Sequence, residues 1–515
     1  MEATAMTSSG AREQKGLKKD AITFTSNVVI GVASTAPAYS LAATLGFLTL
    51  IGGIGVGAPA IMLIAFIPML FIALAYNYMN RADPDCGTTF TWVTKAMGPF
   101  SGWMGGWAIV VADIIVMANL SQIAGIYTFR LFDWTSAVNS TFAVTVAGVV
   151  WIVVMTWICW RGIELSARTQ KFLLGMEFVT LVVFAVVALI TVYVNHPITI
   201  VGPHTYRSIE PQAGWFNPFN IGITPLIKGV LLAIFIYWGW DTCVTVNEET
   251  EDAGRAPGRA AIVSTLLLLA IYLVVSTAAE AYGGPGLLSA NSTDIFGGGL
   301  ARSVLGSPLD KLLIIAVLTS ASASTQTTIL PTARTTFSMA RQRAFPSAFA
   351  RIHQRYQTPD VSTIVMGVLS TAWFIAIVNL STNVLSDSIT AIGFSIAFYY
   401  GLTGFACAIY YRRELLKSAR NFFYIGVLPV LGGAMLTFIF VYAIVQYQNP
   451  ANDVSKPILG IGAPVVIGIG SLLLGVVLTL VARVPYREFF SRKLEVADPA
   501  VLLDGYVAPA IEGRS

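Results

Sequence analysis

Long apolar segments joined by short polar connections make up most of this chain. Each segment is about 20 residues or longer, the length that an α-helix needs to cross the hydrocarbon core of a bilayer. The pattern therefore predicts an all-α membrane protein with twelve spans, near residues 24–50, 57–80, 102–129, 141–160, 172–194, 224–247, 260–282, 310–335, 361–380, 387–411, 422–446 and 458–482.

Composition supports this interpretation, because 55% of the residues are hydrophobic and only 11% are charged. We expect one transmembrane domain over residues 22–482, between a polar N-terminal tail at 1–21 and a C-terminal tail at 483–515. The N-terminal tail lacks a short apolar core followed by a small-residue cleavage site. A removable signal peptide is therefore not expected.

The distribution of basic residues tests the number of spans. Lys and Arg collect on the cytoplasmic side of membrane proteins. With twelve spans and both termini inside, 25 of the 31 Lys and Arg fall in the tails and the inner connections. An odd number of spans would place the cluster from Arg412 to Arg420 outside. We therefore predict that both tails are cytoplasmic and that the protein lies in the cytoplasmic membrane.

Neither a catalytic nor a cofactor site is indicated by the sequence. The four cysteines are scattered without Cys-x-x-Cys spacing, and the three histidines all fall in connections, so we expect no metal centre. The glycines between Gly52 and Gly57 are followed by Ala58 and Pro59 instead of the Lys-Ser/Thr pair of a phosphate loop. The net charge of +4 follows from membrane orientation and gives no reason to expect nucleic acid binding. We predict that the protein is not an enzyme.

Two spans are interrupted at matching places in the two halves of the chain. The first span is cut at the segment from Gly31 to Pro37, and the sixth at Gly239, which two tryptophans flank. Paired breaks of this kind point to an inverted-repeat transporter, here spans 1–5 (residues 22–195) repeated as spans 6–10 (residues 222–411). A bilayer tolerates such breaks only where the freed backbone is buried in protein or lines a cavity.

The chemistry of a broken helix suggests a binding site at these breaks. A second half-helix begins with free N–H groups that suit a carboxylate, and a first half ends in carbonyls that suit a cation. Pro37 fits the first turn of a second half, which Ser34 or Thr35 can cap. The alternative is a simple proline kink. The predicted substrate-binding residues are Gly31, Val32, Ala33, Ser34, Thr35, Phe235, Tyr237, Trp238, Gly239, Trp240 and Asp241.

At these motifs the chain resembles the amino acid, polyamine and organocation superfamily of permeases, which has a leucine-transporter-type inverted repeat of five plus five spans. The resemblance covers about residues 20–482 and implies a transporter without a cofactor. It rests on Gly239-Trp240-Asp241 with Glu248-Glu249, on Arg255, Pro257 and Arg259, on Gly87, Gly98-Pro99, Gly102 and Gly106-Trp107, and on Ala333-Arg334, Met339-Ala340-Arg341, Pro346 and Thr358-Pro359.

Two departures from the family pattern concern the first and fifth spans. Many relatives have a glycine-rich first break, whereas this chain keeps only Gly31 there. In proton-coupled amino acid members a lysine in the fifth span can take the place that sodium has in sodium-coupled relatives. A gapless match puts Glu177 at that position, so a carboxyl group would have to replace the lysine.

Three acidic residues within spans need an explanation, because a charge at membrane depth costs roughly 2.5 to 3.5 kcal/mol on insertion scales. Glu177 is either a proton carrier, since burial favours its neutral form, or a permanently protonated hydrogen-bond donor. Asp113 either takes part in ion coupling or bonds to polar partners on neighbouring helices. Asp241 either binds substrate or caps the second half of the sixth span.

Other polar and aromatic groups leave two interpretations open. Tyr237 and Trp238 can form pocket walls beside Gly239 or simply pack between helices. The hydroxyls of Ser324 and Thr325 can bind a sodium ion together with first-span carbonyls, or they can serve close helix packing.

We predict a secondary transporter that moves an amino acid by alternating access. In this mechanism amides near Ala33 to Thr35 bind the substrate carboxylate and carbonyls near Phe235 to Trp238 bind its amine. Trp238 or Tyr237 closes the outer path, and protonation of Glu177 permits inward opening. The partners are then the substrate, a coupling proton or Na⁺, and the lipid bilayer. The alternatives are a polyamine carrier that uses its three buried acids, and a channel or membrane sensor.

Overall fold

In the part of the chain that the computed structural model describes, twelve helical spans are long and apolar enough to cross a membrane, which confirms the all-α fold and the predicted number of spans. The structure describes residues 15–201, 204–292, 294–380, 384–450 and 457–495. The helices of this part are α1 Phe24–Ser34, α2 Pro37–Leu50, α3 Ala58–Ala82, α4 Thr89–Met97, α5 Pro99–Leu131, α6 Thr135–Val138, α7 Thr141–Arg161, α8 Ile163–Asn195, α9 Ile223–Tyr237, α10 Thr242–Thr245, α11 Ala256–Ala290, α12 Ala301–Leu305, α13 Asp310–Arg341, α14 Asp360–Leu380, α15 Val384–Tyr410, α16 Ala419–Asn421, α17 Leu428–Tyr447, α18 Ala463–Ala482 and α19 Arg487–Phe490.

Two spans extend eight or nine residues beyond one end of their predicted ranges. The fifth span, α8, begins at Ile163 rather than near residue 172, so Arg168 and Lys171 lie on the helix and not in a connection. The seventh span, α11, continues to Ala290 past a kink at Gly284, whose φ is 64°. Hydropathy finds only the part of a helix that lies in the apolar layer, and both extensions carry polar or glycine-rich turns.

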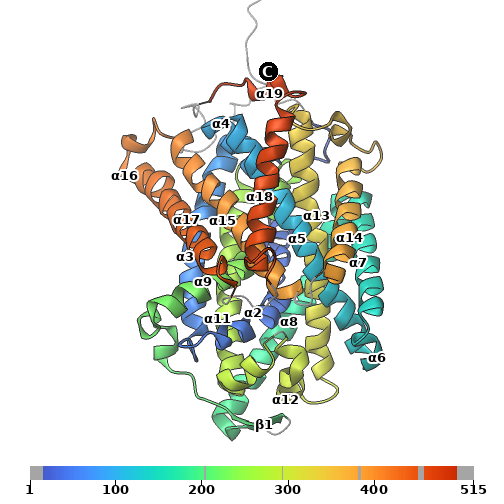
Figure 1. Cartoon of the computed structure of the whole chain (residues 1–515), viewed down its shortest axis with the longest axis vertical. Helices are drawn as coiled ribbons and strands as arrows, with labels where there is room; N and C mark the ends of the chain where they lie inside the picture. Colours follow the sequence, from blue (N-terminus) through green and yellow to red (C-terminus); the bar gives the residue numbers. More distant parts are fainter. Residues whose placement is uncertain (1–14, 202–203, 293, 381–383, 451–456, 496–515) are drawn as a thin grey trace, which may run out of the picture.

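The only strands in the described part of the chain form one small hairpin at the end of the bundle opposite the C-terminal helix α19 (Figure 1). β1 (Ile198–Val201) pairs antiparallel with β2 (His204–Arg207). The hairpin lies in the connection between α8 and α9. The connection is therefore folded, but it contributes no strand to a larger sheet.

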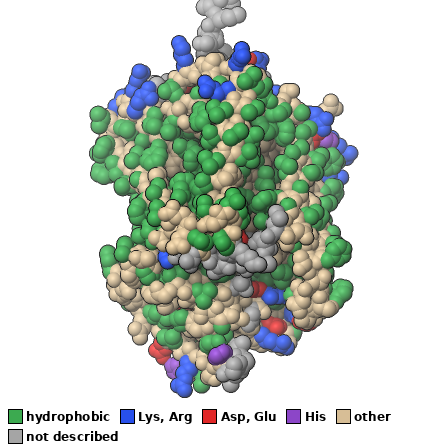
Figure 2. All heavy atoms as spheres, in the orientation of Figure 1, with side chains coloured by type: hydrophobic (Ala, Val, Ile, Leu, Met, Phe, Trp, Pro, Cys, Tyr) green, Lys and Arg blue, Asp and Glu red, His purple; other side chains and the backbone are tan. Residues whose placement is uncertain are grey.

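Burial separates a central group of helices from a peripheral one. The apolar window of the broken first span, α1 and α2, is 94% buried, whereas that of α18 is only 28% buried. Figure 2 shows hydrophobic side chains over the middle of the visible face and Lys and Arg at its two ends. A band of this kind matches a bilayer flanked by polar layers, with the broken helices held at its centre by their neighbours.

Candidate functional site

The first break is a two-residue interruption between α1 and α2 within one span. α1 ends where the amide of Thr35 donates to Val32 O, and Ala36 follows in the left-handed region with φ 48°. Pro37 then opens α2 at a position where no N–H is needed, as the sequence predicted. No side chain of the residues just before α2 caps it, so the prediction that Ser34 or Thr35 caps it is wrong. The Thr35 hydroxyl donates backwards to Val32 O instead.

The second break touches the first. α9 ends at Tyr237, and Gly239 takes φ 113°, which L side chains rarely adopt. A Cβ at Gly239 would lie 2.8 Å from the carbonyl oxygen of Ser34. The hydroxyls of Ser34 and Thr242 are also hydrogen-bonded, at 2.8 Å. Glycine is thus required at the sixth-span break for both its conformation and its close contact with the first span.

A carboxyl group from another helix occupies the start of α2. Glu177 on α8 is fully buried, and its Oε1 accepts hydrogen bonds from the amide of Ala38 at 2.7 Å and from the hydroxyl of Ser320 at 2.8 Å. The amide of Tyr39 donates to the same Ser320 hydroxyl at 3.2 Å. The free N–H groups at the start of α2 therefore bind polar side chains of the protein itself.

A small cavity lies beside the two breaks. Five predicted residues line it, namely Ser34, Asp113, Trp238, Gly239 and Asp241. Its volume of about 10 Å³ is near the least that holds one water molecule. No Lys, Arg or His lines it. The cavity is thus occluded, and its only charged side chains are two acids.

Sequence reasoning missed half of the cavity lining. The missed residues are Ile109, Thr242, Thr328, Pro331 and Tyr399, from four different helices. The available signal was the Tyr399–Tyr400 pair, because two phenol groups inside an apolar span need hydrogen-bond partners.

Hydroxyl groups bind both acids of the cavity. Tyr399 and Tyr400 donate to the carboxylate of Asp241 at 3.1 and 2.8 Å, and Thr332 donates to Asp113 at 2.5 Å. The indole N–H of Trp238 is hydrogen-bonded to the Tyr399 hydroxyl. Asp241 stands at the start of α10 without a side-chain capping bond, so the capping interpretation of this residue is wrong. Its carboxylate is instead part of a polar network on the cavity wall.

The remaining residues predicted at the sixth-span break pack away from the cavity. Tyr237 donates its hydroxyl to Met62 O and packs against Tyr272. Trp240 is fully buried between Tyr76 and Tyr400, and Phe235 packs edge-on against Tyr39. Among the four aromatic residues predicted at this break, only Trp238 lines the cavity.

The remaining predicted first-span residues pack in the core, and only one of the two predicted sodium ligands donates a hydrogen bond to the first span. Gly31 allows close packing, since a Cβ there would meet Ser264 Oγ at 2.6 Å, and Val32 and Ala33 lie in the core. Ser324 does reach the first span, where its hydroxyl donates to Ser34 O at 2.8 Å. Thr325 donates to Ala321 O on its own helix, as packing of small residues predicts.

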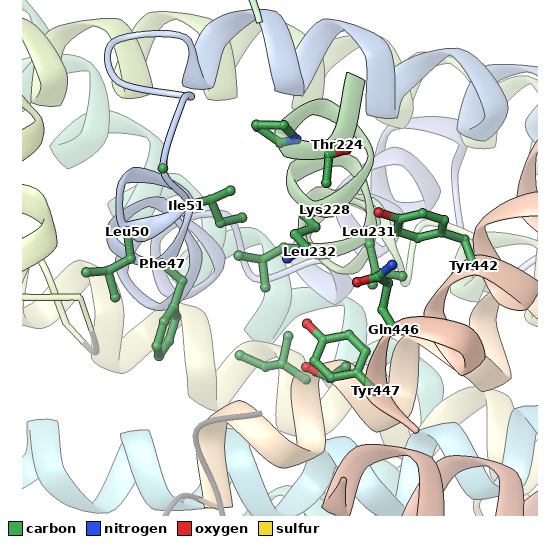
Figure 3. Close-up of a pocket in the computed structure, with 14 residues that line it drawn as sticks. Phe47, Leu50, Ile51, Thr224, Lys228, Leu231, Leu232, Tyr442, Gln446 and Tyr447 are labelled. Atoms are coloured by element: carbon green, nitrogen blue, oxygen red, sulfur yellow. The ribbon is translucent and has the colours of Figure 1, made fainter. Parts of the chain in front are cut away.

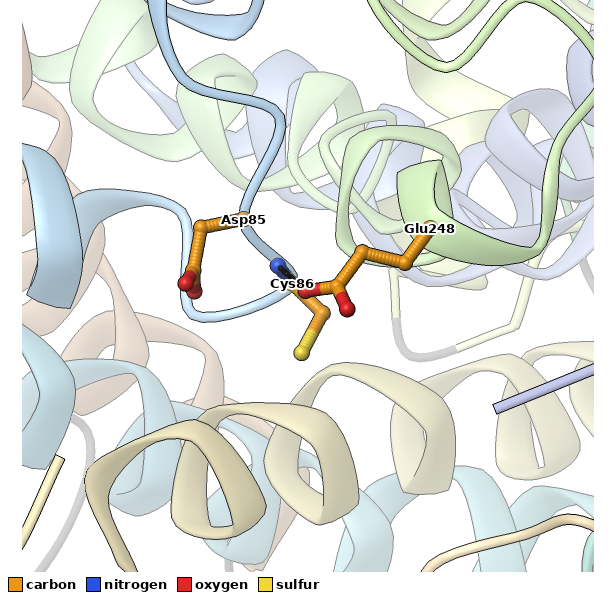
Figure 4. Close-up of side chains that lie close together, drawn as sticks. All are labelled: Asp85, Cys86 and Glu248. Carbon is orange, nitrogen blue, oxygen red and sulfur yellow. Dashed lines mark hydrogen bonds between the residues drawn. The ribbon is translucent and has the colours of Figure 1, made fainter. Parts of the chain in front are cut away.

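At the end of the bundle where the described chain begins, Lys15 joins two connections. Its ammonium lies 2.6 Å from Asp85, after α3, and 2.7 Å from Glu248, after α10. Cys86 lies between these acids, and its amide donates to Glu248 at 2.9 Å (Figure 4). We call Lys15, Asp85, Cys86 and Glu248 the N-terminal clamp. Asp85, Cys86 and Glu248 place oxygen and sulfur atoms that could bind a metal ion within 4.8 Å of one another. The positive charge beside these atoms is the Lys15 ammonium.

Backbone bonds extend this clamp. The amides of Ala21 and Ile22 both donate to Glu249 O, and the amide of Glu251 donates to Ile22 O. The Glu249 carboxylate forms a buried ion pair with Arg334 on α13 at 2.5 Å. This end of the bundle is therefore closed by the N-terminal segment and by two ionic clusters.

Comparison with known proteins places the chain among permeases. Residues 19–472 match the sequence model of the family described as "Amino acid permease". The chain is 23% identical over 375 residues to the low-affinity putrescine importer PlaP of Escherichia coli, covering 73% of this chain and 78% of that protein.

Two further relatives carry amino acid names. The branched-chain amino acid permease BcaP of Lactococcus lactis is 23% identical, over 43% of this chain and 48% of its own length. The human Asc-type amino acid transporter 1 is 24% identical, over 57% and 54%.

Proposed function

Since the chain belongs to the amino acid permease family, we propose that it is a secondary transporter of small cationic amines in the cytoplasmic membrane, with both termini in the cytoplasm. Transport of amino acids or amines is the function that the relatives have in common by name. The choice of an amine as substrate, the alternating-access mechanism and the coupling ion are our proposals.

One observation carries the choice of an amine: the cavity offers acceptors, whereas the donors that would hold a carboxylate are already used. The amides that open α2 bond to Glu177 and Ser320. Those of Thr242 and Cys243 bond to backbone carbonyls. The two acids on the cavity wall and the Trp238 ring suit an ammonium group instead.

An amino acid remains the second candidate, because the anion at α2 can be exchanged. Burial favours the protonated form of a carboxyl group, and protonation of Glu177 would weaken its bond to the amide of Ala38. A substrate carboxylate could then take its place on the same N–H groups. The names of the lactococcal and human relatives favour this reading.

Both candidates give Glu177 the same part in ion coupling. We propose that Glu177 binds the coupling proton and that its release from Ala38 frees α2 to move relative to α8. Ser320 on α13 bonds to the same carboxyl oxygen, so the change would reach three helices at once. A sodium site at Ser324 has weaker support, because that hydroxyl already donates to Ser34 O.

Pairs of solutes that differ only by a carboxylate test the proposal. In proteoliposomes, putrescine should compete for uptake at least as well as ornithine, and 3-methylbutylamine at least as well as leucine. Asp113→Asn should weaken amine binding about 10- to 100-fold, the usual effect of one charged hydrogen bond. A tenfold preference for either amino acid would contradict the amine assignment and favour the second candidate. Lack of saturable counterflow with every solute would contradict a carrier altogether.

A further inference from the structure

A cavity in the described part of the chain lies at the other end of the bundle from the N-terminal clamp. Its volume is about 440 Å³, within the usual range for small-molecule sites. It lies between the end of α2, the start of α9, and parts of α15 and α17. None of its lining residues lines the central cavity. It is therefore a separate compartment.

A lysine without a partner lies in this pocket. Lys228 is on the second turn of α9, inside the apolar sixth span. Within the described residues its ammonium forms no ion pair or hydrogen bond. By contrast, Asp113, Glu177, Asp241 and Arg334, which also lie within spans, are all hydrogen-bonded. An unpaired charge at membrane depth is expensive and usually marks a site for a ligand or an ion.

The walls around Lys228 are amphiphilic. Figure 3 shows Phe47 and Leu50 on one side and Tyr442 and Gln446 on the other, with Lys228 between them. Leu50 is 53% exposed, which leaves the pocket open at its α2 side. The polar groups of α17 thus face an apolar wall across the ammonium group. A site with this lining suits a molecule that has both a charged head and a hydrocarbon part.

We propose that this pocket binds an amphiphile with an anionic head, a carboxylate or a phosphate, whose charge pairs with Lys228. The apolar part of the ligand lies against Phe47, Leu50 and Leu231. The sign of the charge distinguishes this ligand from the solute of the central cavity, which is lined by acids. The head can come from a free organic acid or from an anionic phospholipid, since basic pockets between membrane helices bind such head groups.

Binding of octanoate to the full-length protein in phosphatidylcholine nanodiscs tests the site, with octylamine as the matched cationic probe. Octanoate should raise the unfolding temperature, because ligands of the folded state stabilise it by mass action. Octylamine should not. Lys228→Met should weaken octanoate binding about 10- to 100-fold, and Lys228→Arg should preserve it. Lys311→Met is the control, because Lys311 pairs with Asp133 elsewhere on the surface.

A second variant keeps the test valid if Lys228→Met does not fold. Leu50→Trp leaves the charge intact but fills the open side of the pocket, and it should also prevent octanoate binding. Equal binding of octanoate to the parent and to all three pocket variants, or equal binding of octylamine, would overturn the proposal.

Nanodiscs that contain phosphatidylglycerol identify the source of the ligand. Loss of octanoate binding there supports a lipid head group, and unchanged binding supports a free organic acid. Both results require the anion site. Because the readout is binding and not transport, the outcome is independent of the proposed function.

Discussion

Removal of the Lys15 ammonium should open the end of the bundle that the N-terminal clamp closes. Lys15→Met keeps most of the side-chain length but leaves Asp85 and Glu248 facing each other without a cation. Both contacts are shorter than 3 Å, at 2.6 and 2.7 Å. If the connections separate when this end opens, the variant loses stability only in the closed state. The open conformation should therefore gain population.

The burial of the clamp sets the magnitude. Breaking a fully buried ion pair costs about 3 to 5 kcal/mol, whereas an exposed pair contributes about 0 to 1 kcal/mol. Lys15, Asp85 and Glu248 have exposed fractions of 15%, 14% and 19%. We therefore expect a loss of about 2 kcal/mol, which corresponds to a shift of about 30-fold in the equilibrium between open and closed states.

Cys86 provides a natural probe for this opening. Its thiol is fully buried in the clamp, so its rate of alkylation by N-ethylmaleimide reports how often this end opens. Burial and the Glu248 carboxylate raise the pKa of the Cys86 thiol well above its ordinary value, and the Lys15 ammonium opposes that rise. Removal of Lys15 makes the thiol chemically less reactive. Faster labelling in the variant can therefore come only from opening.

Two further variants complete the experiment. Lys18→Met is the matched control, because Lys18 lies in the same segment but pairs with Glu164 at the surface, with exposed fractions of 41% and 56%. Lys15→Met combined with Glu248→Gln should return the rate toward that of the parent, since the repulsion between the acids is relieved. An unchanged labelling rate in Lys15→Met, or an equal increase in Lys18→Met, would refute the gating role of Lys15.

Three more predictions concern the site and the pH dependence. Glu177→Gln should abolish uptake driven by a pH gradient but preserve substrate exchange in proteoliposomes; accumulation that still follows the gradient would exclude Glu177 as the proton carrier. Gly239→Ala should cost about 1 to 3 kcal/mol and lower the unfolding temperature and the transport rate together, because its Cβ meets the Ser34 carbonyl and its φ is positive; parent-like stability would contradict the close contact. The effect of Lys15→Met should be constant between about pH 6 and about pH 8, because Lys15 and Asp85 keep their charges there. Burial raises the pKa of Asp85, but Lys15 and hydrogen bonds outweigh this and lower it from 3.8 to about 2, so its stabilisation is lost only as the pH falls through that range. Burial lowers the pKa of Lys15, but Cys86, Asp85 and Glu248 outweigh this and raise it above 10.5, so its contribution is lost only in strong alkali; a variation of the labelling ratio at neutral pH would disprove this.

The spans could be predicted because each one is set by local composition. Twenty apolar residues in a row have few alternatives to a membrane helix, and backbone breakers such as Gly239 and Pro37 mark where that helix must stop. The start of α8 was misplaced because its first turns, with Arg168 and Lys171, are polar although helical. Helices that extend beyond the apolar layer are stabilised by their own hydrogen bonds, and hydropathy does not detect them.

The site could be predicted only in part, because side-chain partners depend on how distant helices pack. Asp113, Trp238 and Asp241 were found from their unusual chemistry within apolar spans. The pairing of Asp241 with Tyr399 could not be found, since it joins residues that are 158 positions apart. The sequence predicted a substrate carboxylate near the first break, but only the packing of α8 against α2 reveals that the Glu177 carboxyl group lies at the start of α2.

The direct contact between the two breaks has a kinetic consequence. A cavity of about 10 Å³ has no room for an organic solute, so the proposed binding there requires Ser34 and Gly239 to separate first. Association that waits for such a rearrangement is slower than the typical 10⁵ to 10⁷ M⁻¹s⁻¹ of simple docking. The association rate should also level off at high solute concentration. There the separation of the two breaks limits the rate of binding, and the diffusional encounter between solute and protein does not.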